Sequence, residues 1–237
     1  MAKTKQGPFD ETYHHIEAPT VQDEEYGRET KKRKLIIPDR TTGPEAYRDP
    51  TYYYLRNAMW NYSRKVDGEN IRICWDGEQA LWNGKSNAFV CNMDFHEYMD
   101  NTFLEEIFEE KFGRDKRVII FGEKMGKKTQ GNELGLDKDE VIVYDVNVNG
   151  TWLAPVDVKI VASYFGVRTV YDLMEQQTHE DSLVKLIHDC SVGKFKDWEG
   201  IVAHPTVELR TQKGNRIIVK IKNKDYYRDE GKMLPSD

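Results

Sequence analysis

A lysine beside a turn and two carboxylates at the edges of apolar runs are the residues of this sequence best suited to chemistry on a phosphate. Lys65 precedes the turn-forming pair Asp67 and Gly68, and Glu123 and Glu199 each adjoin a glycine. A lysine amine can act as a nucleophile, and carboxylates are ligands for Mg²⁺. Taken one at a time, these residues are more typical of an ordinary turn and of surface acids.

Two further lysines alternate with an apolar residue near the end of the chain, at Lys220, Ile221 and Lys222. Successive side chains of a strand point to opposite faces, so both ammonium groups would lie on one face and Ile221 on the other. Such a face could neutralise a polyphosphate. A solvated strand has the same alternation, so the pair alone leaves both interpretations open.

Taken in order, these groups resemble the motifs of the covalent nucleotidyltransferases, the superfamily of RNA ligases, DNA ligases and mRNA capping enzymes. The matching segments are Lys65-Val66-Asp67-Gly68, Ile119-Ile120-Phe121-Gly122-Glu123, Tyr144-Asp145-Val146, Glu199-Gly200-Ile201-Val202 and Lys220-Ile221-Lys222. Asn70 stands where DNA ligases and capping enzymes usually have arginine. The resemblance is therefore closest to ATP-dependent RNA ligases of the bacteriophage T4 RNA ligase 2 type, and it covers about residues 60–226.

The resemblance implies an enzyme that joins RNA 5′-phosphate and 3′-hydroxyl ends through a covalent lysyl-AMP and an RNA-adenylate, in RNA repair. Lys65 would be the nucleophile, with Lys220 and Lys222 as further catalytic residues. The residues expected to bind ATP are Arg64, Asp67, Gly68, Asn70, Lys85, Glu123, Tyr144 and His204. Glu199, with Glu123 as a second candidate, would bind Mg²⁺ or Mn²⁺.

Three positions depart from the usual residues of these enzymes. Lys85 replaces a common arginine, His204 a common lysine and Arg64 a frequent glutamate. Lysine lacks the bidentate fork that arginine offers a phosphate, and histidine is mostly uncharged at neutral pH. We expect these changes to alter the rates of individual steps and to leave the reaction class unchanged.

The nucleophilic amine has to lose a proton before it attacks, because a free lysine has a pKa near 10.4. Burial, a bound metal ion and the cationic neighbours Arg64, Lys220 and Lys222 would all disfavour the charged form. Tyr144 would stack on adenine, which contributes roughly 1–3 kcal/mol for a base on an aromatic ring.

Two other functions fit the same motifs. The first is a DNA ligase or a capping-type nucleotidyltransferase, which Asn70 disfavours. The second is an inert RNA-binding module with the same fold, which the intact Lys65 and Glu199 disfavour.

The periodicity of apolar residues predicts strands and helices that could position these groups. Strands are expected at 70–75, 117–121, 141–146, 200–203, 207–211 and 216–222, and helical stripes at 95–112, 158–165 and 183–187. Lys213-Gly214-Asn215 is typical of a hairpin turn. The pattern predicts an α+β nucleotidyltransferase fold of mainly antiparallel sheets flanked by helices, with the nucleotide site between the sheets.

Composition divides the chain into a polar N-terminal segment, 1–50, packed on the core, an adenylation domain, 51–228, and a tail, 229–237. No regular element is expected in the first segment, and no separate OB or C-terminal domain. The net charge of −6 argues against a protein that coats nucleic acid through overall charge. An accessory protein could supply grip on RNA.

The cysteine and apolar content predict the compartment. Cys74, Cys91 and Cys190 are odd in number and far apart, which is typical of reduced thiols. No apolar run is long enough for a membrane span or a signal peptide core. We expect no membrane association and a cytoplasmic location, in the host cytoplasm if a virus encodes the protein.

Overall fold

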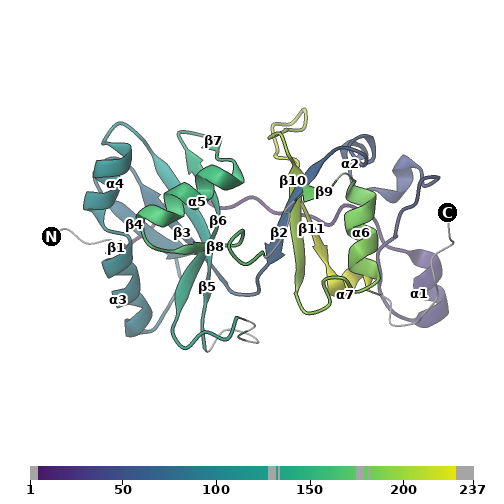
Figure 1. The fold of residues 1–237 in the computed structure, drawn as a ribbon, viewed down its shortest axis with the longest axis horizontal. Helices are drawn as coiled ribbons and strands as arrows, with labels where there is room; N and C mark the ends of the chain where they lie inside the picture. Colours follow the sequence, from purple (N-terminus) through teal and green to yellow (C-terminus); the bar gives the residue numbers. More distant parts are fainter. Residues whose placement is uncertain (1–4, 128–131, 133, 175–178, 181, 228–237) are drawn as a thin grey trace. The chain divides into compact units, whose positions relative to one another are not determined.

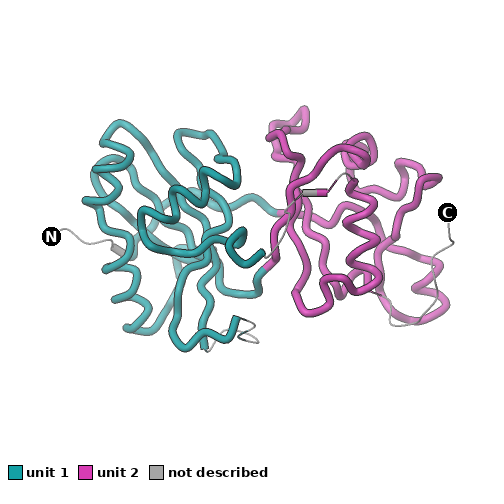
Figure 2. Tube along the Cα trace, in the orientation of Figure 1, with its two compact units in different colours: residues 1–15, 66–175 teal, residues 16–65, 176–237 magenta. Residues whose placement is uncertain are grey.

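The computed structural model describes residues 5–127, 132, 134–174, 179–180 and 182–227. The chain divides into two compact units (Figure 2). Unit 1 comprises Met1–His15 and Val66–Glu175, and unit 2 comprises Ile16–Lys65 and Gln176–Asp237. Each unit is therefore built from segments that are far apart in the sequence. The expected tail at 229–237 lies outside the described residues.

Unit 1 contains a mostly antiparallel sheet (Figure 1). Its described strands are β1 (Lys5–Gln6), β3 (Glu69–Trp75), β4 (Ala80–Gly84), β5 (Val118–Met125), β6 (Glu140–Val148), β7 (Thr151–Trp152) and β8 (Arg168–Thr169). Their order is β1-β4-β3-β5-β6-β7, and β8 also pairs with β6. β1 pairs with β4 in parallel, and β8 pairs with β6 in parallel. The other neighbours pair antiparallel.

Three helices of unit 1 share one hydrophobic core with the sheet: α3 (Met93–Thr102), α4 (Glu105–Phe112) and α5 (Pro155–Tyr164). Phe95, Phe108 and Val158 from these helices pack with Ile73 and Ile120 of the sheet, and all five are fully buried. The apolar residues on that face of β3 and β5 are thereby covered. The opposite face carries Asn70 and Glu123, which were predicted to bind nucleotide.

Unit 2 contains a smaller antiparallel sheet with the strand order β11-β10-β2-β9. Its elements are α1 (Glu24–Thr30), η1 (Pro44–Ala46), α2 (Pro50–Tyr54), β2 (Trp60–Lys65), β9 (His179–Glu180), α6 (Leu183–Ser191), β10 (Gly200–Pro205), β11 (Val219–Lys222) and α7 (Asn223–Tyr226). Helix α6 buries Leu183, Leu186 and Ile187 against Ile201 and Ile221 of the sheet.

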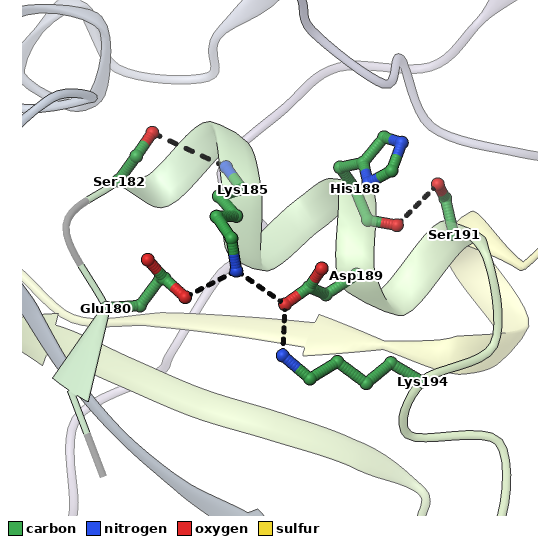
Figure 3. A network of polar contacts seen from close by, with 7 residues as sticks. All are labelled: Glu180, Ser182, Lys185, His188, Asp189, Ser191 and Lys194. Carbon is green, nitrogen blue, oxygen red and sulfur yellow. Dashed lines mark hydrogen bonds and ion pairs between the residues drawn. The ribbon is translucent and has the colours of Figure 1, made fainter. Parts of the chain in front are cut away.

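A network of ion pairs fixes α6 beside β9 (Figure 3). The Lys185 Nζ lies 2.6 Å from a Glu180 oxygen and 3.2 Å from Asp189 Oδ2, which also accepts from Lys194 Nζ at 2.6 Å. Ser182 caps the first turn of the helix. Pairs between half-exposed lysines and carboxylates contribute little individually, about 0–1 kcal/mol. The network therefore orients the helix, while the buried leucines hold it in place.

The predicted α+β fold with mainly antiparallel sheets and flanking helices is confirmed. Strands β3, β5, β6 and β10 form where they were expected, and the predicted helical stripe over 95–112 is two helices, α3 and α4. No helix in the described part of the chain is long and apolar enough to span a membrane.

Other expectations were wrong. Residues 207–211 form no strand, and the strand expected at 216–222 is confined to β11 at Val219–Lys222. Ile217 and Ile218 before it are both buried, so they do not follow the alternation of a strand. The expected hairpin turn at 213–215 does form: Gly214 has a positive φ, Arg210 and Arg216 form an antiparallel bridge, and the Ile217 N–H donates to the Leu209 carbonyl oxygen at 3.0 Å. Helix α1 forms in the segment where no element was expected, with Asp23 capping its first turn. Strands β2 and β4 were not predicted.

Candidate active site

Three charged side chains of unit 2 meet at one end of its sheet. In the register of the sheet, Gly200 of β10 lies between Lys65 of β2 and Lys222 of β11. Cross-strand neighbours share a face, so both lysine side chains lie on the same side. Glu199 directly precedes Gly200, and its two carboxylate oxygens accept hydrogen bonds from different amines, one from Lys65 Nζ and one from Lys222 Nζ.

Gly200 is the residue that allows β10 and β11 to pair this closely. Its φ is +153°, and a Cβ built there would lie 2.2 Å from the Ile221 carbonyl oxygen and 2.7 Å from the Lys222 Cα. Those contacts are with backbone, which cannot move aside without breaking the strand pairing. A glycine after Glu199 is therefore needed to bring Lys222 level with Lys65.

The charges around Glu199 keep it ionised. Burial by itself would raise the pKa of the Glu199 carboxyl, but hydrogen bonds and charge from Lys222 and Lys65 outweigh burial and lower the pKa below its usual value. The Lys65, Glu199 and Lys222 side chains are 21%, 17% and 19% exposed. Charges this poorly solvated interact more strongly than surface ion pairs do.

Lys220 adds a third amine to the same face. It pairs with Val202 of β10, which in turn pairs with Ser63 of β2, one alternation along from Gly200. Burial lowers the pKa of Lys220, and the ammonium groups of Lys222 and Lys65 lower it further. Three amines thus share this face, and two of them bind the Glu199 carboxylate. This excess of positive charge favours an anionic ligand.

Arg64 and His204 lie apart from this cluster. Arg64 pairs with Ile201, which faces the core, so its side chain leaves the opposite face of β2, and its guanidinium carbon lies 5.5 Å from the Trp198 ring centroid. His204 lies on the lysine face but four residues beyond Gly200, about 13 Å at 3.3 Å per residue. Its Nδ1 is 2.9 Å from the Pro205 carbonyl oxygen. The structure therefore does not bring either residue to Lys65.

Unit 1 gathers a second group of predicted residues on the outer face of its sheet. Asn70 of β3 pairs directly with Glu123 of β5, and the Asn70 amide donates to the Tyr144 hydroxyl at 2.6 Å. Burial raises the pKa of that hydroxyl, and the nearby Glu123 carboxylate raises it further. Tyr144 is therefore a neutral aromatic ring whose outer end is fixed by a hydrogen bond.

A β-bulge places two consecutive side chains on this face. Phe121 pairs with Asp145 and Gly122 with Val143, so Tyr144 is the extra residue of the bulge. Bulges redirect side chains in this way. Asp145 and Tyr144 both contact Tyr13, whose hydroxyl donates to the Asp145 carboxylate at 2.8 Å and whose ring lies 5.0 Å from that of Tyr144. Tyr13 thus contacts both residues of the aromatic-Asp motif.

The remaining predicted residues lie at the edges of strands in unit 1. Asp67 and Gly68 form the link before β3, and a Cβ at Gly68 would lie 2.5 Å from the Lys124 carbonyl oxygen. The Lys124 amine holds Glu69 at 2.8 Å and Asp139 at 3.4 Å, which fixes the start of β3. Lys85 is exposed directly after β4.

Sequence reasoning missed Tyr13. It lies in a segment without a periodic pattern, so no local signal could have identified it. Its partner Asp145 was visible as the second residue of a motif, but no role was predicted for it. A buried acid in an otherwise apolar strand requires a hydrogen-bond donor, and this requirement was the available signal.

The residues present fit a metal ion whose ligands come mainly from the bound phosphates and water, with one carboxylate from the protein. No group of three or more histidine, cysteine or acidic side chains suited to a metal occurs among the described residues. Glu199 alone, however, is an ionised carboxylate that already binds two cationic groups. Mg²⁺ commonly takes one or two carboxylates and completes its shell with phosphate and water. Glu199 is suited to that kind of site.

Comparison with known proteins identifies the class that this fold and this lysine cluster define. The model of the RNA ligase family matches residues 59–222, which is more than half of the chain. The chain therefore belongs to the RNA ligase family. This confirms the family predicted from the motifs, while the bacteriophage T4 RNA ligase 2 type stays a prediction. No curated protein sequence matches this chain significantly.

Solved structures of Naegleria gruberi RNA ligase share the fold. The ligase with PPi is 13% identical, with a TM-score of 0.53, and the match covers 73% of this chain and 52% of that one. A variant of it with ATP and Mn is 12% identical, with a TM-score of 0.53, and the match covers 87% of this chain and 59% of that one. This chain thus spans little more than half the length of those ligases, and at this identity the likeness shows the fold alone.

Proposed function

We propose that this protein is an ATP-dependent RNA ligase that joins RNA 5′-phosphate and 3′-hydroxyl ends through a covalent AMP on Lys65. One observation carries the proposal: in a member of the RNA ligase family, Lys65 and Lys222 share the Glu199 carboxylate on the sheet face that also bears Lys220. We assign the chemistry to residues 51–228, with 1–50 packed on them.

The first step transfers AMP to the protein. The Lys65 Nζ attacks the α-phosphorus of ATP, a nitrogen–phosphorus bond forms, and the bond from that phosphorus to the pyrophosphate oxygen breaks. An ammonium group has no lone pair, so Lys65 has to leave Glu199 and give up a proton to water before it attacks. The positive charges of Lys220 and Lys222 would neutralise the departing pyrophosphate.

Glu199 would hold Mg²⁺ or Mn²⁺ together with the phosphates. Glu199 would hold such an ion once Lys65 has left it, and the ion would supply positive charge that stabilises the reacting phosphate. Solved neighbours carry ATP or AMP with Mn, which supports a divalent cation in the reaction proposed for this chain. Glu123 remains a second candidate.

The polar face of unit 1 would bind the nucleoside. Tyr144 offers a neutral ring for adenine, and Asn70 and Glu123 lie beside it. Asp67, Gly68 and Lys85 would complete the contacts with ATP, as the family resemblance implies. The proposed place for the nucleotide between the two sheets stays a prediction.

Two later steps would complete ligation. An oxygen of the RNA 5′-phosphate attacks the phosphorus of lysyl-AMP and releases the Lys65 amine. The 3′-hydroxyl oxygen of a second end then attacks the 5′-phosphorus, its proton passes to water, and AMP leaves. Both steps form one phosphorus–oxygen bond for each bond broken. We propose RNA repair in the cytoplasm as the setting, in keeping with the free thiols of Cys74, Cys91 and Cys190.

A pulse and chase experiment tests this function. Protein is incubated with Mn²⁺ or Mg²⁺ and ATP or GTP labelled at the α-phosphate, and then chased with RNA or DNA that carries a 5′-phosphate. We expect label on the protein from ATP and its transfer to RNA. Labelling from GTP alone, or transfer to DNA alone, would support the capping-type or DNA ligase alternative. A protein that takes no label at all would favour an inert RNA-binding module.

A further inference from the structure

Asn223 directly follows Lys222 and is 9% exposed. Its side-chain amide donates to the carbonyl oxygens of Phe195 and, at 2.6 Å, of Trp198. Its side-chain oxygen accepts from the Cys190 thiol at 2.9 Å. One buried residue thus joins helix α6, the loop before β10 and the end of β11.

The surroundings determine which way the Asn223 amide points. Two carbonyl oxygens can be satisfied only by the NH₂ group, and a thiol hydrogen can be accepted only by the oxygen. All three contacts agree on one orientation. An aspartate would bring a carboxylate against the Phe195 and Trp198 carbonyl oxygens, so isosteric replacement should be worse than truncation.

These bonds fix the backbone around Glu199. The Asn223 backbone N–H donates to the Glu199 carbonyl oxygen at 3.0 Å, and the amide side chain holds Trp198, the residue before Glu199. Gly200, the residue after it, pairs with Lys222 in the sheet. The backbone is therefore held on both sides of Glu199, from which its side chain projects. Asn223 is also the next residue after Lys222, whose amine is one of the two that Glu199 binds.

We propose that Asn223 is a positioning residue for the adenylylation step: it holds the Glu199 carboxylate where both Lys65 and Lys222 can reach it. It acts through Glu199 and does not contact ATP. This inference rests on the proposed function for its consequence in catalysis, but its geometric content concerns only residues of unit 2. Residues that orient a metal-binding carboxylate typically change metal affinity or activity by about 10–100-fold when they are replaced.

The first test compares Asn223→Ala with a matched control, Asn147→Ala, at a temperature where both variants are folded. Asn147 is 8% exposed in unit 1, and its side-chain oxygen accepts a hydrogen bond from the Gly150 N–H at 2.8 Å, within a turn. We expect Asn223→Ala to label at least about 10-fold more slowly and to need more Mn²⁺ for half-maximal rate. Asn223→Asp should be slower still. Asn147→Ala should need the same Mn²⁺ concentration as the wild-type protein, even if its melting temperature falls as much as that of Asn223→Ala.

The second test needs neither ATP nor metal. An amine-acylating reagent is applied, and modification of Lys65 and Lys222 is followed by peptide mass spectrometry, with the exposed Lys116 as internal reference. We expect Asn223→Ala to accelerate modification of both lysines severalfold relative to Lys116, because their carboxylate partner is displaced. Unchanged relative rates would overturn the proposal. If the unmodified protein takes no label from ATP but acylation still changes, the positioning role stands and the ligase function fails.

Discussion

Glu199 accepts hydrogen bonds from two amines that are more than 150 residues apart in the sequence, Lys65 and Lys222. Its carboxylate lies between two of the three amines of this face, and its lowered pKa keeps it ionised at neutral pH. Removing that charge would leave the amines to repel one another. Loss of the ion pairs should affect the chemistry more than the fold, because Lys65, Glu199 and Lys222 lie at one end of the sheet and outside the hydrophobic core of unit 2.

Replacing Glu199 by glutamine tests this argument. Glutamine keeps the size but replaces one accepting oxygen by a donating NH₂ group, so it can accept from only one of the two amines, and it removes the charge that a divalent ion prefers. We expect Glu199→Gln to raise the Mn²⁺ concentration for half-maximal adenylylation about 10-fold or more, with a small change in melting temperature. Wild-type labelling at limiting Mn²⁺ would show that the carboxylate is purely structural.

Tyr144 is the residue on which nucleotide affinity should depend in unit 1. Tyr144→Ala removes the ring and should weaken ATP binding by roughly 1–3 kcal/mol, the usual contribution of one stacked base. Tyr144→Phe keeps the ring and loses the hydrogen bond from Asn70, so it should lower stability by about 0.5–1.5 kcal/mol and leave ATP affinity near normal. Calorimetric titration with ATP measures both. Equal weakening in the two variants would assign the contribution to the hydroxyl instead of the ring.

At the scale of elements, the pairing of β10 with β11 decides whether the amines meet. A shift of one residue would turn Lys220 and Lys222 to the other face. This register requires a glycine at position 200, because a side chain there would collide with the Ile221 carbonyl oxygen.

The two glycines Gly200 and Gly214 allow this to be tested with a matched pair. Both have positive φ, but a Cβ at Gly214 would meet nothing within 4 Å. We expect Gly214→Ala to cost only backbone strain, on the order of 1 kcal/mol, and to label normally. Gly200→Ala should destabilise the protein further and lower the labelling rate sharply. If both variants labelled alike at a temperature where they are folded, the register of β11 would not control the site.

Sequence alone predicted some elements well and others poorly, for physical reasons. Strands β3, β5 and β6 carry runs of buried apolar residues, so their composition identifies them. Strand β2 is a central strand, yet its buried residues in the sheet are only Trp60 and Ser63, and it lacks such a run. The strand that ends at Lys65 was therefore missed, although Lys65 itself was found from its motif.

At the scale of the whole molecule, motif order was enough to predict the family, which the match over residues 59–222 confirms. Motifs could not reveal that the N-terminal segment contributes Tyr13 to unit 1 and Glu17 to the edge of β11, because those contacts depend on long-range packing. Nor could they show that Arg64, next to Lys65, leaves the opposite face of β2. Strand alternation determines that face, and it could be applied only once β2 was known.

The central claim is that Lys65 carries AMP. The most direct measurement is to incubate the protein with ATP and Mn²⁺, digest it, and locate AMP by mass spectrometry, with Lys65→Arg and Lys116→Arg as the matched pair. We predict AMP on the peptide that contains Lys65. We also predict no AMP in Lys65→Arg, because a guanidinium stays protonated and cannot attack, and normal labelling in Lys116→Arg. AMP on any other residue, or labelling that persists in Lys65→Arg, would contradict the account.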